Sequence, residues 1–284
     1  MKAWRALQAG RTTRRLLADA PVPDGWTRSA VNTQRRLALG RVRNESGLVH
    51  VRVGDFDVAG FSISSLAFLH NEIFVKLAYY FRSRRPDPLI IDGGSNIGMS
   101  VLFFKALYPD ARVLAFEPAA PAHRLLVANV EANRLADVEV HHAALGRENR
   151  VVPFYEDPDD PATFRMSTRR ERIPGGETTV EQRRLSGLID GDVDLLKLDV
   201  EGAEDDVIDE LVESGAMARV DQLVVEYHHH LDPARDFLDV FLERLRAQGF
   251  RYQLAAREQI ADRANREPAF QDVLVHAYRT RLAA

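Results

Sequence analysis

Short apolar runs alternate with segments of helical periodicity from residue 89 to the end of the chain. The apolar runs, each the length of one strand, cover residues 89–92, 112–116, 138–144, 194–199 and 222–227. The helical segments between them cover residues 99–107, 121–133, 204–213 and 237–247. Because each pair of parallel strands needs a crossover, this alternation predicts an α/β fold with a parallel sheet covered on both faces. Two last runs, 250–255 and 273–278, have no helix between them, so we expect a mostly parallel sheet with an antiparallel edge strand.

Residues 1–85 have a different pattern. Leucines and alanines lie between arginines over the first 20 residues, which indicates an amphipathic helix. Two alternating runs, 48–53 and 56–63, flank a Gly-Asp turn and predict a β-hairpin. Helical spacing over residues 65–81 predicts a helix that ends before Pro86. We therefore expect a small N-terminal α/β extension (helix, hairpin, helix) over 1–85 and a main domain over 86–284.

An insertion at about 147–190 interrupts the main domain. Strand-like runs at 151–155 and 178–185 flank a polar loop, 156–177. Loops of this length in compact domains are usually functional or disordered. Its hydroxyls and cations, at residues 167–170, fit either a charged surface lid or a segment that covers a substrate.

The composition of the chain excludes several classes of protein. Hydrophobic residues make up 45% and charged residues 28% of the chain, as in soluble globular proteins. The net charge of −4 provides no overall basic field for nucleic acid. The absence of cysteine excludes thiolate metal sites and cysteine nucleophiles. No apolar run approaches the roughly 18 residues of a membrane span, and the first residues lack the pattern of a secretory signal. We expect a cytoplasmic protein.

The strongest local motif is the turn Asp92-Gly93-Gly94-Ser95-Asn96-Ile97-Gly98, which follows a strand and opens a helix. Glycines allow the backbone to turn tightly and approach a ligand, while the helix start presents free N–H groups. Glu117 ends the next strand, about 20 residues further on, where an acid accepts hydrogen bonds from ribose hydroxyls in nucleotide-binding βαβ units. The motif indicates a nucleoside site.

The glycine spacing also indicates which nucleoside. A dinucleotide site carries G-x-G-x-x-G, whereas this turn has G-G-x-x-x-G and begins with Asp92. An acid at the strand end repels phosphates and attracts a cation. S-adenosylmethionine (SAM), with its methionyl ammonium near Asp92, fits better than a nicotinamide dinucleotide.

Four ordered motifs resemble those of the FkbM-type methyltransferases. They read IIDGGSNIGMS, VLAFEPAAPAHRLLVANVEAN, AAL and VDLLKLDVEGAEDDVI. The family pattern runs D-x-G-A-N-x-G, F-E-P, L-x-x-N and L-K-x-D-x-E-G-x-E in the same order. The resemblance covers about residues 71–227, and it departs at Ser95, where alanine is commoner. It implies a class I Rossmann-like methyltransferase domain over 86–284, with SAM as cofactor and S-adenosylhomocysteine as product.

The resemblance also implies roles for individual residues. The SAM loop would consist of Asp92, Gly93, Gly94, Asn96 and Gly98. Glu117 would hold the ribose hydroxyls, and Pro118 would shape the following turn. Ala143, with Ala144, would face adenine. Asp199 and Glu201 would lie beside the transferred methyl group.

The catalytic base has three candidates. Methyl transfer to oxygen requires the hydroxyl to lose its proton, and Asp199, Glu226 and His228 lie at strand ends where a ligand binds. Two acids and a histidine that converge also suit a divalent metal, which the sequence does not favour over a metal-free site. Glu201 and Glu204 fit helix capping equally well. Lys197, inside an apolar strand, is either a buried cation paired with an acid or a lysine that reaches solvent.

The expected function is SAM-dependent O-methylation of a hydroxyl on a sugar, glycolipid or secondary metabolite, as in natural-product biosynthesis. The substrate class follows from the resemblance alone. Three alternatives stay open: a nicotinamide oxidoreductase on the same fold class, a nucleic-acid methyltransferase that uses the N-terminal arginines, and a non-catalytic SAM-binding module. The N-terminal extension either covers the site or forms a homodimer, and the sequence does not choose between them.

Overall fold

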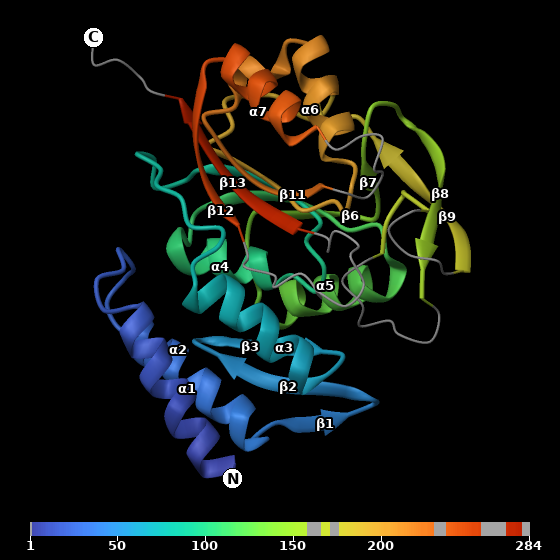
Figure 1. Cartoon of the computed structure of the whole chain (residues 1–284). Coiled ribbons are helices and arrows are strands. Elements are labelled where there is room, and N and C mark those ends of the chain that lie inside the picture. Colours follow the sequence, from blue (N-terminus) through green and yellow to red (C-terminus); the bar gives the residue numbers. More distant parts are fainter. Residues whose placement is uncertain (1, 158–165, 171–175, 230–236, 257–270, 280–284) are drawn as a thin grey trace, which may run out of the picture.

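A seven-stranded sheet forms the centre of the computed structural model, which describes residues 2–157, 166–170, 176–229, 237–256 and 271–279 (Figure 1). Its order is β12-β13-β11-β10-β4-β5-β6. The strands are β4 (Leu89–Gly93), β5 (Arg112–Phe116), β6 (Val138–His141), β10 (Leu195–Leu198), β11 (Gln222–His229), β12 (Phe250–Ala256) and β13 (Gln271–Arg279). β4, β5, β6, β10 and β11 pair in parallel, which confirms the predicted α/β fold. Near one edge, β13 lies between β11 and β12 and runs antiparallel to both, and β12 is the edge strand.

Helices cover both faces of this sheet. The helices are α4 (Met99–Leu107) and α5 (Ala120–Ala132) on one face, and α6 (Glu204–Glu213) and α7 (Leu238–Ala247) on the other (Figure 1). Successive strand residues belong to different cores: Ile90 packs with α4, and Ile91 packs with α6. Most residues of the central strands are apolar because both of their faces are buried.

The N-terminal extension contains more helix than predicted. Its elements are α1 (Lys2–Leu16), α2 (Trp26–Leu39), β1 (Arg43–Glu45), β2 (Leu48–Val53), β3 (Phe56–Gly60), α3 (Ile63–His70) and a π-helical turn, η1 (Asn71–Val75). The first helix and the hairpin are confirmed. The prediction missed α2, since its buried stripe of Trp26, Ala30 and Leu37 lies among exposed arginines. The helix expected over 65–81 was too long: regular helix ends at Val75, and Leu77 adopts a left-handed φ of 58°.

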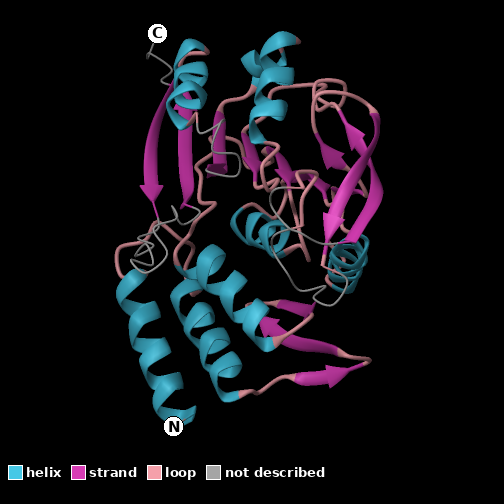
Figure 2. Cartoon of the chain, turned by 45° about the vertical axis from the view of Figure 1, so that its right-hand side comes forward, coloured by secondary structure: helices cyan, strands magenta, loops and turns pink. Residues whose placement is uncertain are grey.

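The extension packs against α4 and α5, on the side of the sheet away from α6 and α7 (Figures 1 and 2). The Trp26 ring stacks on Phe74 and meets the edge of Phe103 in α4, with ring centroids 5.5 and 5.4 Å apart. The Asn129 amide of α5 accepts the Ala59 N–H at 2.8 Å and donates to the Ala59 carbonyl at 3.0 Å. The extension and the sheet therefore share one hydrophobic core.

The insertion contributes two strands to a separate three-stranded sheet of order β7-β9-β8. Its strands are β7 (Ala144–Leu145), β8 (Arg150–Glu156) and β9 (Gly176–Arg183), which confirms the two predicted strands around a polar loop. Part of that loop lies outside the described residues, but residues 166–170 are described. Among the described residues, no helix has the length and apolar character that crossing a membrane requires.

Candidate active site

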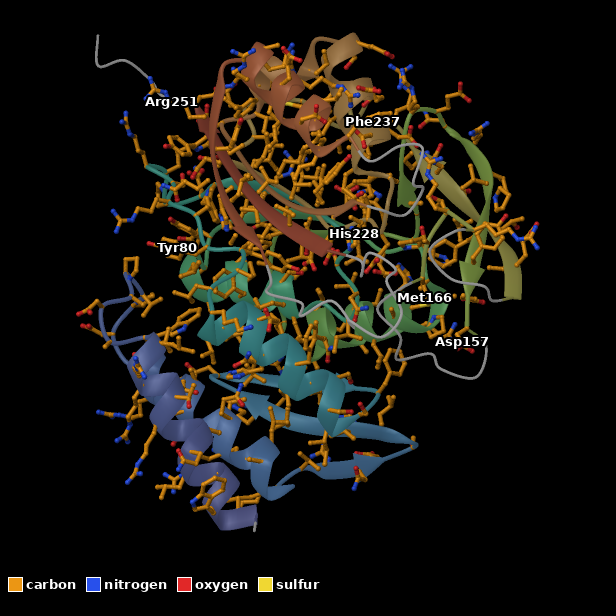
Figure 3. All side chains as sticks on the ribbon, viewed as in Figure 1. Tyr80, Asp157, Met166, His228, Phe237 and Arg251 are labelled. Carbon is orange, nitrogen blue, oxygen red and sulfur yellow. The ribbon has the colours of Figure 1, made fainter. Side chains whose placement is uncertain are left out.

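A pocket opens at the carboxyl ends of β4, β5 and β10, where open α/β sheets bind ligands. It is lined by Leu69, Ile73, Tyr79, Gly94, Ser95, Asn96, Met99, Ser100, Phe116, Glu117, Pro118, Ala143, Ala144, Leu145, Phe154, Met166, Thr168, Lys197, Asp199, Val200, Glu201 and Ala203. These residues come from the extension, the sheet and the insertion together. Figure 3 labels Met166 of the insertion and His228 of β11.

Two glycines of the turn after β4 are required by close packing. Gly94 has a φ of +80°, and a Cβ there would lie 1.8 Å from the Asp199 carbonyl oxygen. Gly98 has a φ of +89°, and a Cβ there would lie 2.8 Å from Leu126 of α5. Since only glycine adopts this backbone at little cost and without a side chain, the turn can lie directly against the end of β10.

Glu117 holds this turn in place. Its carboxylate accepts the Asn96 N–H at 2.7 Å and the Ala119 N–H at 2.8 Å. Burial raises the pKa of Glu117 to about 7, although both hydrogen bonds oppose the shift. Glu117 also lines the pocket, so the carboxylate that shapes the turn faces the pocket as well.

Asp92 lies behind the pocket wall and does not line it. It is fully buried, with Oδ1 3.1 Å from the Lys197 ammonium and Oδ2 accepting the Ser100 hydroxyl at 2.5 Å. Asp92 and Lys197 are register partners on β4 and β10, so the sheet itself brings them together. A direct contact between Asp92 and a methionyl ammonium stays a prediction, and Asp92 already has Lys197 as a cation.

Lys197 is a buried cation, which is the first of the two alternatives that its apolar strand left open. Its ammonium also donates to the carbonyls of Gly93 at 3.1 Å and Gly94 at 2.6 Å. Burial alone would lower the pKa of Lys197, but Asp92 and Asp199 raise it above its usual value. A charged group thus lies in the pocket floor, bonded to the glycine turn.

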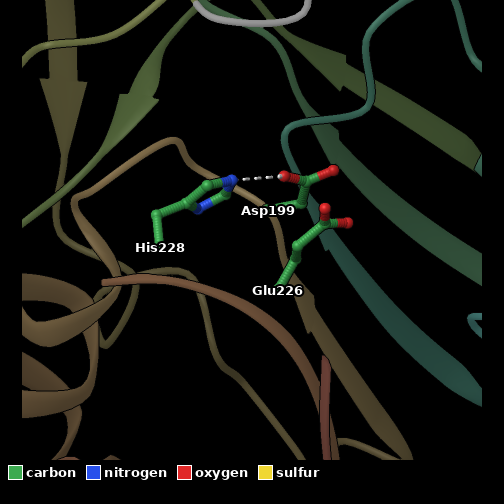
Figure 4. Close-up of side chains that lie close together, drawn as sticks. All are labelled: Asp199, Glu226 and His228. Carbon is green, nitrogen blue, oxygen red and sulfur yellow. Dashed lines mark ion pairs between the residues drawn. The ribbon is translucent and has the colours of Figure 1, made fainter. Parts of the chain in front are cut away.

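Asp199, Glu226 and His228 converge beside the pocket (Figure 4). One ligand atom of each lies within 4.8 Å of the others, and His228 Nε2 is 3.9 Å from Asp199 Oδ1. β10 and β11 pair in parallel with Leu198 opposite Val225, which places Asp199 next to Glu226. The structure therefore brings together the three residues predicted to be catalytic.

His228 is surrounded by carboxylates. Its Nδ1 lies 2.8 Å from Glu204 Oε1 on α6, and its Nε2 lies 3.3 Å from Glu201 Oε2. Burial alone would lower the pKa of His228, but Glu201, Glu204 and Asp199 raise it well above its usual value. Glu204 also accepts the Gly202 N–H at 3.1 Å, as expected for an acid at a helix start.

Tyr79 is a site residue that the sequence did not reveal. Its hydroxyl donates to Asp199 Oδ2 at 3.1 Å, and the Lys197 ammonium lies 5.0 Å from its ring centroid. Tyr79 comes from the extension, 120 positions from Asp199, and no spacing in the chain connects the two.

The predicted cofactor residues divide into two groups. Those that line the pocket are Gly94, Asn96, Glu117, Pro118, Ala143, Asp199 and Glu201. Asp92, Gly93 and Gly98 do not line it and support the turn from behind. Glu226 and His228 are outside the lining set but adjoin Asp199. The apolar lining residues Met99, Phe154 and Met166 were not predicted, because they resemble ordinary core positions.

The fold and the site are those of an α/β protein with a pocket at the carboxyl ends of its parallel strands and an acidic group at one end of that pocket. The Methyltransferase FkbM domain matches residues 92–252, more than half of the chain. The chain belongs to the FkbM methyltransferase family, and the resemblance inferred from its motifs is confirmed.

Several relatives are methyltransferases by name. Methyltransferase 1 of Beauveria bassiana is 32% identical over 163 residues, which cover 50% of this chain and 65% of that protein. The 31-O-demethyl-FK506 methyltransferase FkbM of Streptomyces tacrolimicus is 29% identical over 221 residues, which cover 66% of this chain and 80% of that protein. The solved structure of methyltransferase FkbM from Methylobacillus flagellatus KT is 16% identical with a TM-score of 0.47, covering 97% of this chain and 60% of that one.

Proposed function

We propose that the protein is a SAM-dependent O-methyltransferase for a hydroxyl of a small molecule or glycan, in the class of sugars, glycolipids and secondary metabolites. One observation carries the proposal: a pocket lined by the glycine turn and Glu117 and a convergent acid–histidine group share the Asp199 end of β10. The names of the relatives support it, since one of them O-methylates a natural product by name. We retain the expectation of a cytoplasmic enzyme that does not act on nucleic acid, and homodimer formation stays a prediction.

The residues present fit SAM as the cofactor, which would supply a methyl group bound to a sulfonium. Glu117 would accept hydrogen bonds from ribose hydroxyls. The apolar group of Phe116, Ala143 and Leu145 suits a flat base. Lys197 and Asp199 present opposite charges in the same pocket, which suits the zwitterionic amino-acid part.

The acidic end of the pocket suits proton removal from the acceptor hydroxyl. In the absence of a bound cation, the raised pKa of His228 favours its protonated form, which does not accept a proton. We therefore assign proton acceptance to Asp199 or Glu226, with His228 holding the acids in place. Most of the rate enhancement would come from alignment of the reacting groups, with proton acceptance adding less.

The insertion would complete the acceptor side. Met166 and Thr168 line the pocket, and the Ser167 hydroxyl donates to the Glu201 carbonyl at 2.5 Å. Arg169 pairs with Asp206 of α6 at 2.6 Å. Segments held over a site in this way exclude water and select substrates.

The test has two parts. Calorimetry should detect SAM binding, and NAD(H) should not bind in competition with it. A panel of sugars, glycolipids and polyketide-like alcohols, incubated with SAM, should give S-adenosylhomocysteine with at least one acceptor, and the product should be an O-methyl ether by NMR. Binding of NAD(H) in place of SAM would contradict the proposal, as would methylation of nitrogen or carbon alone.

A further inference from the structure

We propose that Asp199, Glu226 and His228 bind a divalent cation of the Mg²⁺ or Mn²⁺ type. The role of this cation in catalysis depends on the proposed function, whereas its binding can be measured without SAM or acceptor. Four features of the site support cation binding: the spacing of the ligands, the orientation of His228, the orientation of Asp199 and the types of ligand present.

The spacing of the three side chains suits one ion. Their ligand atoms lie within 4.8 Å of one another, and Figure 4 shows the imidazole and both carboxylates at one place. Bonds from Mg²⁺ or Mn²⁺ to nitrogen or oxygen are roughly 2.0–2.2 Å long, so ligand atoms around one such ion lie up to about 4.4 Å apart. The three side chains would therefore need to close by only a few tenths of an ångström to bind one ion. All three residues lie on or directly after paired strands, and the site is therefore formed before the ion arrives.

His228 has the orientation of a metal ligand. Its Nδ1 is 2.8 Å from the Glu204 carboxylate, and both side chains are at most 2% exposed. In metal sites the far nitrogen of a ligating histidine usually donates to a carboxylate, which fixes the ring and leaves the other nitrogen facing the ion. Here the other nitrogen, Nε2, faces Asp199 and Glu201.

Asp199 is oriented by groups on its opposite side. The Tyr79 hydroxyl and the Lys197 ammonium approach Oδ2, at 3.1 and 3.9 Å. Oδ1 faces His228 instead. This division leaves one oxygen of Asp199 directed at the three-residue group, while the lysine stays on the SAM side.

The types of ligand indicate the class of ion and its use. Two carboxylates and one imidazole, without any thiolate, suit Mg²⁺, Mn²⁺ or Fe²⁺ better than structural zinc. Three protein ligands leave positions for water and for an acceptor oxygen. A hydroxyl bound to a divalent cation has a lowered pKa, so the site would favour the ionised acceptor.

The experiment measures Mn²⁺ binding by electron paramagnetic resonance, using full-length protein treated with EDTA and then dialysed. The wild type should bind one Mn²⁺. Glu226→Gln and His228→Gln should each weaken binding at least ~10-fold, and Glu204→Gln should weaken it by about 10-fold through the orientation of His228. Glu139→Gln is the matched control, since Glu139 also pairs with a histidine, His141, at 3.1 Å but lies outside the site. The affinity of Glu139→Gln for Mn²⁺ should equal that of the wild type.

Unfolding curves of each variant, recorded alongside, separate loss of a ligand from loss of the fold. The proposal is overturned if folded wild type binds no Mn²⁺, or if folded Glu226→Gln and His228→Gln bind it as the wild type does. If methyl transfer persists in EDTA and the protein binds no Mn²⁺, the proposed cation site is wrong and the proposed function stands. If the protein binds Mn²⁺ but methylates no acceptor, the cation site stands and the proposed function is wrong.

Discussion

The two walls of the pocket are built in different ways. The glycine wall consists of Gly94, Asn96 and Glu117, all from one β4–α4–β5 unit, and its contacts are mostly backbone hydrogen bonds. The acidic wall consists of Asp199 and Glu201, which line the pocket, with Glu226 and His228 adjoining them. Two strands and the following turn bring these four residues together. The difference teaches that a continuous stretch of chain shapes the cofactor side, whereas pairing between distant segments creates the chemical side.

Lys197 connects the two walls. It bonds the Gly94 carbonyl of one wall and lies 3.9 Å from Asp199 of the other. Substitutions can therefore test whether the walls act separately or through this one cation.

The largest effect is expected from Lys197→Met, which would leave Asp92 buried without its cation. Removal of one member of a buried pair typically costs about 3–5 kcal/mol of stability, and urea unfolding should show a loss in this range. Lys105→Met is the matched control, because that buried ammonium donates to the Ala111 carbonyl and its loss should cost only about 1–2 kcal/mol. Equal losses in the two variants would contradict the connecting role of Lys197.

Glu117→Ala should damage the glycine wall alone. It removes two hydrogen bonds from the turn and the proposed ribose contact, so SAM affinity should fall by about 10- to 100-fold, since hydrogen bonds to charged groups contribute about 1.5–3 kcal/mol. Asp92→Ala should also weaken SAM binding, through Lys197. Calorimetry measures both, with Glu131→Ala on the exposed side of α5 as control. Unchanged SAM affinity in both variants would show that SAM does not bind in this pocket.

The raised pKa of Glu117 predicts a pH dependence of SAM binding. The pKa is about 7 in the folded protein, above its usual value of 4.5, so the acid is mostly protonated at pH 6 and mostly ionised at pH 8. The ionised form accepts ribose hydrogen bonds, and SAM affinity should rise about 10-fold over this interval. The same shift favours the folded state below pH 4.5 and loses that contribution as the pH rises through 7. If the affinity for SAM still rises between pH 6 and pH 8 in Glu117→Ala, a group other than Glu117 causes the pH dependence.

The smallest effect is expected from Tyr79→Phe, which removes one hydrogen bond to Asp199. The loss of about 0.5–1.5 kcal/mol should lower kcat roughly 3- to 10-fold, with the KM for SAM nearly unchanged. Tyr80→Phe is the control, since its hydroxyl accepts from Arg82 rather than from a site residue. A change in the KM for SAM with kcat intact would place Tyr79 in the glycine wall instead.

The same contrast explains what the sequence could predict. The central strands are apolar on both faces and the glycine turn is local, so the sheet, the order of the helices and the positions of Gly94 and Glu117 follow from the chain. The ion pair of Asp92 with Lys197 depends on strand register, and the contact of Tyr79 with Asp199 joins two parts of the chain that no motif connects. α2 was missed because exposed arginines interrupt its apolar stripe.

The most direct test is a crystal structure with S-adenosylhomocysteine bound. We expect the ribose hydroxyls on the Glu117 carboxylate and the sulfur directed toward Asp199, with Glu226 and His228 beyond it. A nucleoside bound elsewhere, or a Glu117 side chain without contact to the ribose, would contradict the account.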